Sequence, residues 1–165
     1  MKRKSIILTS RTVTILTILI LMISGFLLWI FIRSQNQMVK AENETKSLVS
    51  LDYPVKRVNQ FYWSTFDEST FTMDFTDKKN KQRYAIVTAE GGDIQYYTPN
   101  DIINRDEALS IAASENKLDK LLNTRLGLLH KKPIWEIVFK DEHDALTYYY
   151  IDAKSGKWLQ TIGNL

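Results

Sequence analysis

The apolar stretch near the N-terminus constrains this chain more than any other feature. From Thr12 to Ile32 no residue is charged, and most are Ile, Leu, Phe or Val. As a helix this stretch would be about 31 Å long, which matches a bilayer hydrocarbon core of about 30 Å. It is longer than the apolar part of a signal peptide, ends without a good cleavage site, and lacks the polar stripe of a buried helix. We therefore predict an uncleaved transmembrane anchor at 12–32.

The residues flanking this anchor predict its orientation. Four cations and no acids precede it, whereas the segment after Arg33 carries both signs of charge. The positive-inside rule then makes residues 1–11, ending at Arg11, a cytoplasmic tail. Trp29 lies near the opposite end, where aromatic side chains favour the membrane interface. We expect a single-pass cell-membrane protein whose residues after Arg33 are extracytoplasmic.

Composition excludes several classes of protein. The chain has no Cys, so disulfides, thiol nucleophiles, thiolate zinc sites and iron–sulfur clusters are ruled out. The formal net charge is +3, but the four cations of the first eleven residues leave the remainder slightly acidic. A nucleic-acid-binding protein needs a basic face on its folded part, so we expect no nucleic-acid partner.

The segment that follows the anchor is polar and contains neither Gly nor Pro. We predict a helical stalk at 33–50, with a flexible linker as the alternative, and Pro54 marks its end. The next residues, 55–63, fit two periods: Val58, Phe61 and Tyr62 suit a helix turn, and alternate residues suit a strand. Helix and strand both stay open for 55–63.

A first lobe is predicted at 51–99. In the stretch 70–76 every second residue is apolar, which predicts a half-buried strand with Phe71, Met73 and Phe75 facing inward. A return strand at 83–89 and a further strand at 94–97 complete an antiparallel meander.

A second lobe is predicted at 100–165, beginning with a helix. Asn104 at the N-cap and Glu107 three residues later form a capping-box pattern. The apolar face of this helix is expected to continue through Leu118, Leu121 and Leu122. Alternating strands at 135–139 and 146–150 follow. A hairpin with Gly156 at positive φ then leads into a last strand at 158–162.

Three stretches of the second lobe resemble a PepSY domain: Asn104–Ala113, Ile134–Phe139 and Tyr149–Lys157. Together with the anchor, the chain resembles the YpmB/TseB family of membrane-anchored extracytoplasmic proteins. The resemblance implies an α+β fold with two small cystatin-like, PepSY-type lobes, each a helix packed on an antiparallel β-meander. It also implies a regulator of cell-wall elongation that acts with a penicillin-binding transpeptidase.

Residues with catalytic or metal-binding chemistry are few. His130 precedes two lysines and His143 lies in an acidic turn, so neither has partners at metal-ligand spacing. No serine has a nucleophile motif. We therefore predict no enzyme activity, no catalytic residue, no metal site and no cofactor.

Alternating strands place some tyrosines on the face opposite the core. If Tyr148 and Tyr150 face inward, Tyr149 faces outward, and Tyr97 is a similar case. An exposed aromatic side chain is a typical interface anchor, so Tyr97 and Tyr149 are candidate partner-binding residues. The alternative is that they pack beneath the other lobe.

Three functions are compatible with these features. The favoured one is a non-enzymatic, membrane-anchored regulator or adaptor of cell-wall synthesis that binds a penicillin-binding transpeptidase or a similar envelope protein. The alternative is a PepSY-type inhibitor or modulator of an extracytoplasmic peptidase. A hydrolase or a small-ligand binder is the third.

Overall fold

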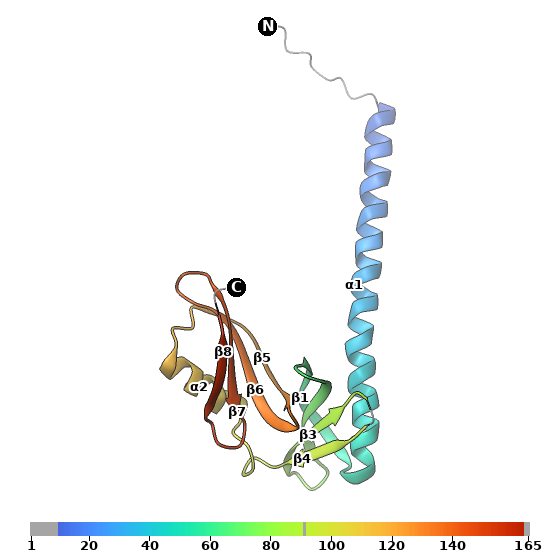
Figure 1. Ribbon diagram of the computed structural model, residues 1–165. Coiled ribbons are helices and arrows are strands. Elements are labelled where there is room, and N and C mark those ends of the chain that lie inside the picture. The colour runs from blue at the N-terminus through green and yellow to red at the C-terminus, as the bar shows by residue number, and fades with distance from the viewer. Residues whose placement is uncertain (1–9, 91, 164–165) are drawn as a thin grey trace. The chain divides into compact units, whose positions relative to one another are not determined.

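The computed structural model describes residues 10–90 and 92–163, with backbone only at 10, 11, 32 and 34–36. It is an α+β structure in which a long helix and a short helix each precede four strands (Figure 1). The elements are α1 (Ser10–Asp52), β1 (Val55–Thr65), β2 (Ser69–Asp77), β3 (Gln82–Thr88), β4 (Ile94–Tyr97), α2 (Arg105–Glu115), β5 (Lys120–Leu129), β6 (Lys132–Lys140), β7 (Leu146–Asp152) and β8 (Trp158–Ile162).

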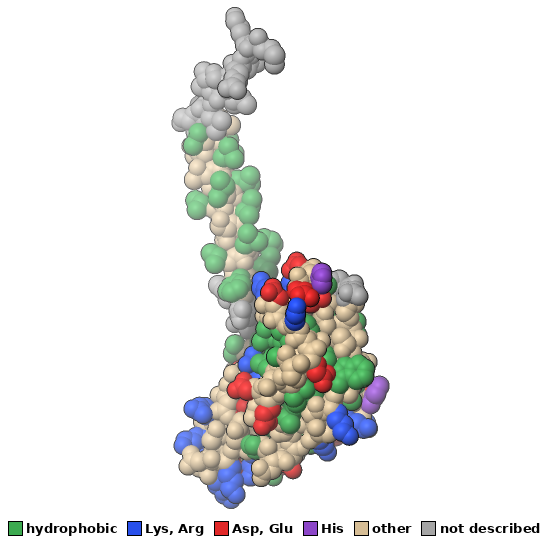
Figure 2. Space-filling model, turned by 90° about the vertical axis from the view of Figure 1, so that its left-hand side faces the viewer, with side chains coloured by type: hydrophobic (Ala, Val, Ile, Leu, Met, Phe, Trp, Pro, Cys, Tyr) green, Lys and Arg blue, Asp and Glu red, His purple; other side chains and the backbone are tan. Residues whose placement is uncertain are grey.

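Helix α1 contains the predicted anchor. Its segment Thr12–Phe31, 20 residues, is long and apolar enough to cross a membrane, and hydrophobic side chains line the described part of the helix (Figure 2). The helix is continuous to Asp52, so the predicted stalk segment 33–50 is helical. Residues 1–9 of the predicted tail and the side chain of Arg11 lie outside the described part of the chain.

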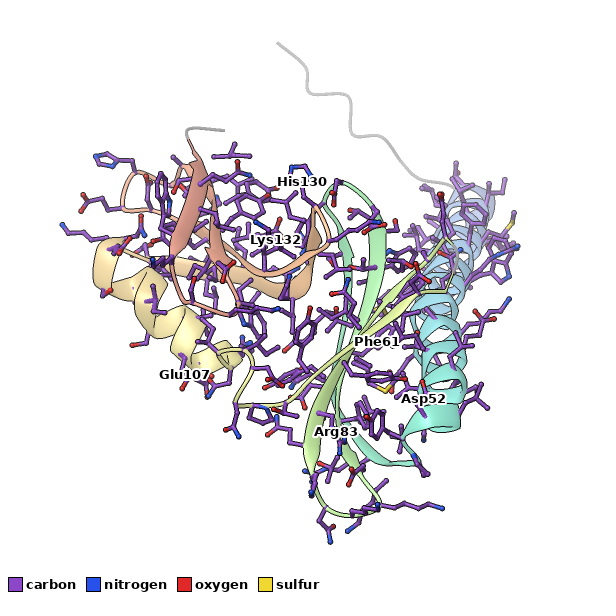
Figure 3. The ribbon with its side chains drawn as sticks, turned by 60° about the horizontal axis from the view of Figure 1, so that its bottom comes forward. Asp52, Phe61, Arg83, Glu107, His130 and Lys132 are labelled. Atoms are coloured by element: carbon purple, nitrogen blue, oxygen red, sulfur yellow. The ribbon has the colours of Figure 1, made fainter. Side chains whose placement is uncertain are left out.

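Of the described residues, those up to Ala41 form one compact unit, and those from Glu42 onward form the other. Within the second unit the end of α1 serves as the helix of the first lobe. Val49 is fully buried against Met73 and Phe75 of β2, at one face of the sheet β1-β2-β3-β4. In Figure 3 Asp52 and Phe61 lie on this side of the sheet. Residues 55–63, open between two structures in the sequence, belong to strand β1, which pairs antiparallel with β2.

The prediction that β2 is half-buried is wrong. Of the three side chains predicted to face inward, Met73 and Phe75 are buried and Phe71 is partly buried. Thr72 and Asp74 on the opposite face are buried as well. The reason is that the second lobe packs over this opposite face, with β5 against β1 and β2. The alternating pattern of β2 predicts that its polar face is exposed to solvent. In the structure this face is instead an interface between the lobes.

Helix α2 begins as the sequence predicts. Asn104 Oδ1 accepts hydrogen bonds from the backbone N–H groups of Asp106 and Glu107, both at 2.9 Å. Glu107 Oε2 accepts in return from the backbone N–H of Asn104 at 2.7 Å, which completes the capping box. Ala108 and Ala112 are fully buried against the sheet β5-β6-β7-β8.

The predicted extension of this helix through Leu118, Leu121 and Leu122 is wrong. The helix ends at Glu115, and Lys120–Leu129 form strand β5, which pairs antiparallel with β6. The pairing satisfies the backbone groups of this segment and covers the edge of β6, which outweighs the helical spacing of three leucines. A register shift between Leu121 and Asn123 leaves Leu121 and Leu122 exposed.

One hydrophobic core joins the two lobes. Tyr62, Tyr84 and Ile86 of the first sheet pack with Trp135 and the α2 side of the second sheet. The rings of Tyr62 and Trp135 meet edge to face, with centroids 5.7 Å apart. Each lobe alone has little interior, so the shared core supplies burial that neither could provide by itself.

Candidate functional site

A polar cleft lies between the lobes and is the strongest candidate site in the described part of the chain. Its volume is about 450 Å³, within the range of small-ligand sites. Three strands of the first lobe form one side, and the start of α2 with β6 forms the other. The lining residues are Gln60, Tyr62, Asp74, Gln82, Tyr84, Asn104, Arg105, Asp106 and Trp135.

Asp74 is the central charged group of this cleft. Its side chain is 9% exposed, and two amides donate to it. Asn59 Nδ2 donates to Oδ1 at 2.9 Å, and Gln82 Nε2 lies 3.0 Å from both carboxylate oxygens. Among the described residues no Lys, Arg or His forms an ion pair with Asp74. The cleft therefore holds a nearly buried carboxylate that neutral groups alone satisfy.

Two tyrosines flank this carboxylate. Burial, with a smaller contribution from the Asp74 charge, raises the pKa of Tyr62 to about 12 and the pKa of Tyr84 also to about 12. Both hydroxyls therefore stay protonated over the physiological range and can donate or accept hydrogen bonds. Gln82 Nε2 reaches the Tyr84 hydroxyl at 3.4 Å. The Trp135 indole N–H donates to the carbonyl oxygen of Ile103 at 2.9 Å, which fixes its ring.

The first turn of α2 forms the opposite rim. Asn104, which caps the helix, lies beside Arg105 and Asp106 in the lining, and Figure 3 places Glu107 on the same turn. Arg105 Nη1 lies 3.8 Å from Asp106 Oδ1, in an ion pair between largely exposed neighbours. Arg105 lines the cleft but forms no ion pair with Asp74, which has no charged partner among the described residues.

The histidines and the acidic turns bring no metal site together. No group of three or more potential ligands occurs among the described residues. His130, at the tip of the β5–β6 hairpin (Figure 3), instead joins the lobes: its Nδ1 lies 3.1 Å from Asp67 Oδ2, and its backbone N–H donates to the same oxygen at 2.7 Å. His143 lies in an exposed turn that Asp141 organises.

The prediction that Tyr149 faces outward is wrong. Tyr149 is 2% exposed and packs on the α2 face of its own sheet, where its hydroxyl donates to Glu115. The sequence could not show which of these tyrosines face the core, because residues 148–150 are all Tyr and so lack the alternation of apolar and polar side chains. Tyr150, on the other face, is buried too, since Phe66 of the first lobe packs edge to face on its ring.

Tyr97 and the residues that flank the predicted membrane anchor are not among the residues that line the cleft. Tyr97 is half-buried against the shared core and donates from its hydroxyl to Gln95 Oε1 at 2.6 Å. Lys154 Nζ lies 5.4 Å from the centroid of its ring. On α1 the Arg33 guanidinium lies over the Trp29 ring, 5.3 Å from its centroid. Partner binding by Tyr97 stays a prediction.

Sequence reasoning missed the cleft because its residues are scattered from Gln60 to Trp135. One signal was present: Asp74 interrupts a strand that otherwise alternates apolar residues with Thr. A carboxylate at that position is either exposed to solvent or held by specific hydrogen-bond donors. The second of these holds here because the second lobe packs over this face of the strand.

Strand β8 forms an exposed apolar edge of the second sheet. Its side chains Trp158, Leu159 and Ile162 are 55%, 41% and 44% exposed. Leu121 and Leu122, which are also exposed, lie on β5 at the opposite edge of the same sheet. Exposed apolar side chains on an open edge strand are a feature of interaction surfaces.

Comparison with known proteins gives a fold. No protein-family model matches the chain, and no curated protein sequence matches it. Among solved structures, the YpmB protein from Bacillus subtilis matches with a TM-score of 0.63 and 23% sequence identity, over 72% of this chain and 94% of that chain. This similarity confirms the predicted α+β architecture and, at the level of the fold, the predicted resemblance to YpmB.

Proposed function

We propose that this protein is a non-enzymatic, membrane-anchored extracytoplasmic regulator or adaptor of cell-wall synthesis. It binds a penicillin-binding transpeptidase or a similar envelope protein. The observation that carries the proposal is a YpmB-like two-lobed fold on a chain whose N-terminal helix is apolar enough to cross a membrane. The PepSY resemblance of the second lobe adds support.

The orientation belongs to the proposal. With the N-terminal cations in the cytoplasm, both lobes lie outside the cell, where cell-wall enzymes work. Anchoring confines the lobes and a membrane-bound partner to one surface, which raises their effective concentration, so a modest affinity suffices.

The exposed edge at β8 is a surface that suits this role. An edge strand offers unpaired backbone groups, and Trp158 adds an exposed aromatic side chain of the kind that dominates binding energy at interfaces. Natural proteins tend to protect such edges, so an apolar edge left open favours a binding role.

Crosslinking of the full-length protein in cells tests the proposal. A photo-reactive residue at position 158 probes the β8 edge, one at position 97 probes the predicted Tyr97 contact, and one at Lys79 in the β2–β3 turn is the control. We expect a cell-wall transpeptidase to be captured from position 158 or 97 and not from 79. A version with an unrelated transmembrane helix should capture the same partner.

Two results contradict the proposal. Capture of extracytoplasmic proteases alone would favour the inhibitor function that the PepSY resemblance also allows. Equal capture of all envelope proteins from the three positions would show that no specific partner is bound.

A further inference from the structure

We propose that the cleft around Asp74 is a binding site for a primary ammonium group, supplied by a lysine side chain of an extended peptide. This site is separate from the β8 edge and does not rest on the proposed function. The proposal follows from the charge, the open hydrogen-bonding capacity and the shape of the cleft.

The charge of the cleft selects a cation. Carboxylates that are almost fully buried normally pair with a cation, because a buried charge without a counterion is costly. Asp74 is 9% exposed, and among the described residues its partners are the neutral amides of Asn59 and Gln82. Arg105 also lines the cleft, but its ion pair is with Asp106, at 3.8 Å, and not with Asp74. An incoming cation would supply the missing counterion.

The open acceptors fit an ammonium group. Asp74 Oδ1 accepts from two amides, whereas Oδ2 accepts from Gln82 alone within the described structure, so Oδ2 retains free acceptor capacity. Tyr62 is 8% exposed, and its hydroxyl, which lines the cleft, has no hydrogen-bond partner among the described residues. An ammonium group carries three donors and no acceptor, which matches a carboxylate oxygen beside tyrosine hydroxyls.

The shape favours a peptide over a free amine. A second hollow of about 450 Å³ lies along β1 and β2 and shares Asp74 and Gln82 with the cleft. Its other lining residues are Arg57, Val58, Asn59 and Thr76. The two hollows adjoin at Asp74 and Gln82, which line both, so together they make a groove that passes Asp74. The Asn59 amide is already bonded to Asp74, Arg57 and Thr76, whereas Gln82 Oε1 accepts no hydrogen bond from the described residues and can accept one from a peptide N–H. A lysine side chain would reach Asp74 while its backbone continues along the groove.

Calorimetric titration of the full-length protein in lipid nanodiscs tests this inference. The probe is the peptide acetyl-Gly-Lys-Gly-amide, and the matched control peptide has norleucine in place of Lys. We expect saturable binding of the lysine peptide and at least tenfold weaker binding of the norleucine peptide, because a charge-assisted hydrogen bond is lost. If the two peptides bind equally well, the proposal is overturned, and no variant of the protein is needed for that conclusion.

Variants locate the site. Asp74→Asn removes the charge and should weaken the lysine peptide about tenfold or more, whereas Asp93→Asn, on an exposed turn, should change nothing. Tyr62→Phe removes only a hydroxyl, keeps the core ring, and should weaken binding severalfold even if Asp74→Asn fails to fold. If both variants fold and both bind the lysine peptide as tightly as the unsubstituted protein, the assignment of the site is overturned.

A last arm separates the peptide from other amines. A glucosamine trimer carries the same ammonium chemistry on a sugar. Binding of this trimer more tightly than the lysine peptide would overturn the assignment to a peptide.

Discussion

Gly127 on β5 lies directly against Ser64 on β1, where the two lobes meet. A Cβ atom at Gly127 would overlap the Ser64 hydroxyl and come within 2.7 Å of the Phe66 ring. Ser64 is fully buried, and its hydroxyl is bonded to that of Thr70 at 2.7 Å, so it cannot move aside. The lobes therefore meet where one of them lacks a side chain.

Gly127→Ala should destabilise the protein by about 1–3 kcal/mol, because overpacking a close contact forces buried groups apart. Chemical denaturation followed by tryptophan fluorescence measures the change. Gly163→Ala is the matched control: its added Cβ meets Thr147 at 3.4 Å, an ordinary contact, and should have little effect. Equal stability of the two variants would show that the lobes adjust freely at Gly127.

Asn104→Ala should cost about 1 kcal/mol of stability, within the range of lost N-caps, because two backbone N–H groups of α2 lose their acceptor. Thermal unfolding by circular dichroism gives the measurement. Asn100→Ala, in an exposed turn outside any helix, serves as the control. A cap variant as stable as this control would rule out a contribution of the capping box.

Arg125→Met should destabilise the protein strongly, by about 3 kcal/mol. Glu136 is 3% exposed, and Arg125 is its counterion, so the substitution leaves a buried carboxylate with only the Tyr150 hydroxyl as partner. Lys140→Met removes the exposed ion pair with Asp144 and should cost at most about 0.5 kcal/mol. Urea denaturation of both variants makes the comparison, and similar losses would contradict it.

Stability should fall as the pH rises from about 10 to about 12. Burial, as the largest cause, raises the pKa values of Tyr62, Tyr84 and Tyr149 to about 12, above the value near 10 in the unfolded chain. The folded state then binds more protons than the unfolded state in this window, so its advantage is complete below pH 10 and lost through pH 12. Denaturation midpoints at pH 9 and pH 11 test this, with tyrosinate absorbance reporting the ionisation. Equal midpoints would contradict it.

Leu21→Arg should reduce membrane integration. Leu21 lies near the middle of the apolar segment, where an arginine costs about 2.5–3.5 kcal/mol on insertion scales. Gln37→Arg, on the same helix beyond that segment, is the control. The protein remaining in the membrane fraction after alkaline extraction is the readout, and equal retention of both variants would argue against a membrane-spanning segment.

Helices, strands and turns can be predicted from the sequence where residues close together in the chain carry a single clear pattern. The capping box of α2, the turn at Gly156 and the strands around Met73 and Trp135 depend on residues close in sequence, so they can be predicted from it. Strand β5 could not, because three leucines at helical spacing conceal a segment whose structure depends on pairing with β6. Strand β6 follows β5 after only His130 and Lys131, and neither is the Gly or Asn that would mark such a tight turn in the sequence.

The sequence by itself determined the apolar segment at 12–32, the absence of cysteine chemistry and the α+β class, because each depends on composition or short-range periodicity. Only the tertiary structure decided which polar residues became buried. Packing of the second lobe on the first turned Asp74 from a solvent-facing strand residue into the charge of a cleft, and α2 covered Tyr149. The physical reason is that burial is a property of what lies opposite a residue, and for these side chains that partner lies far away in the chain.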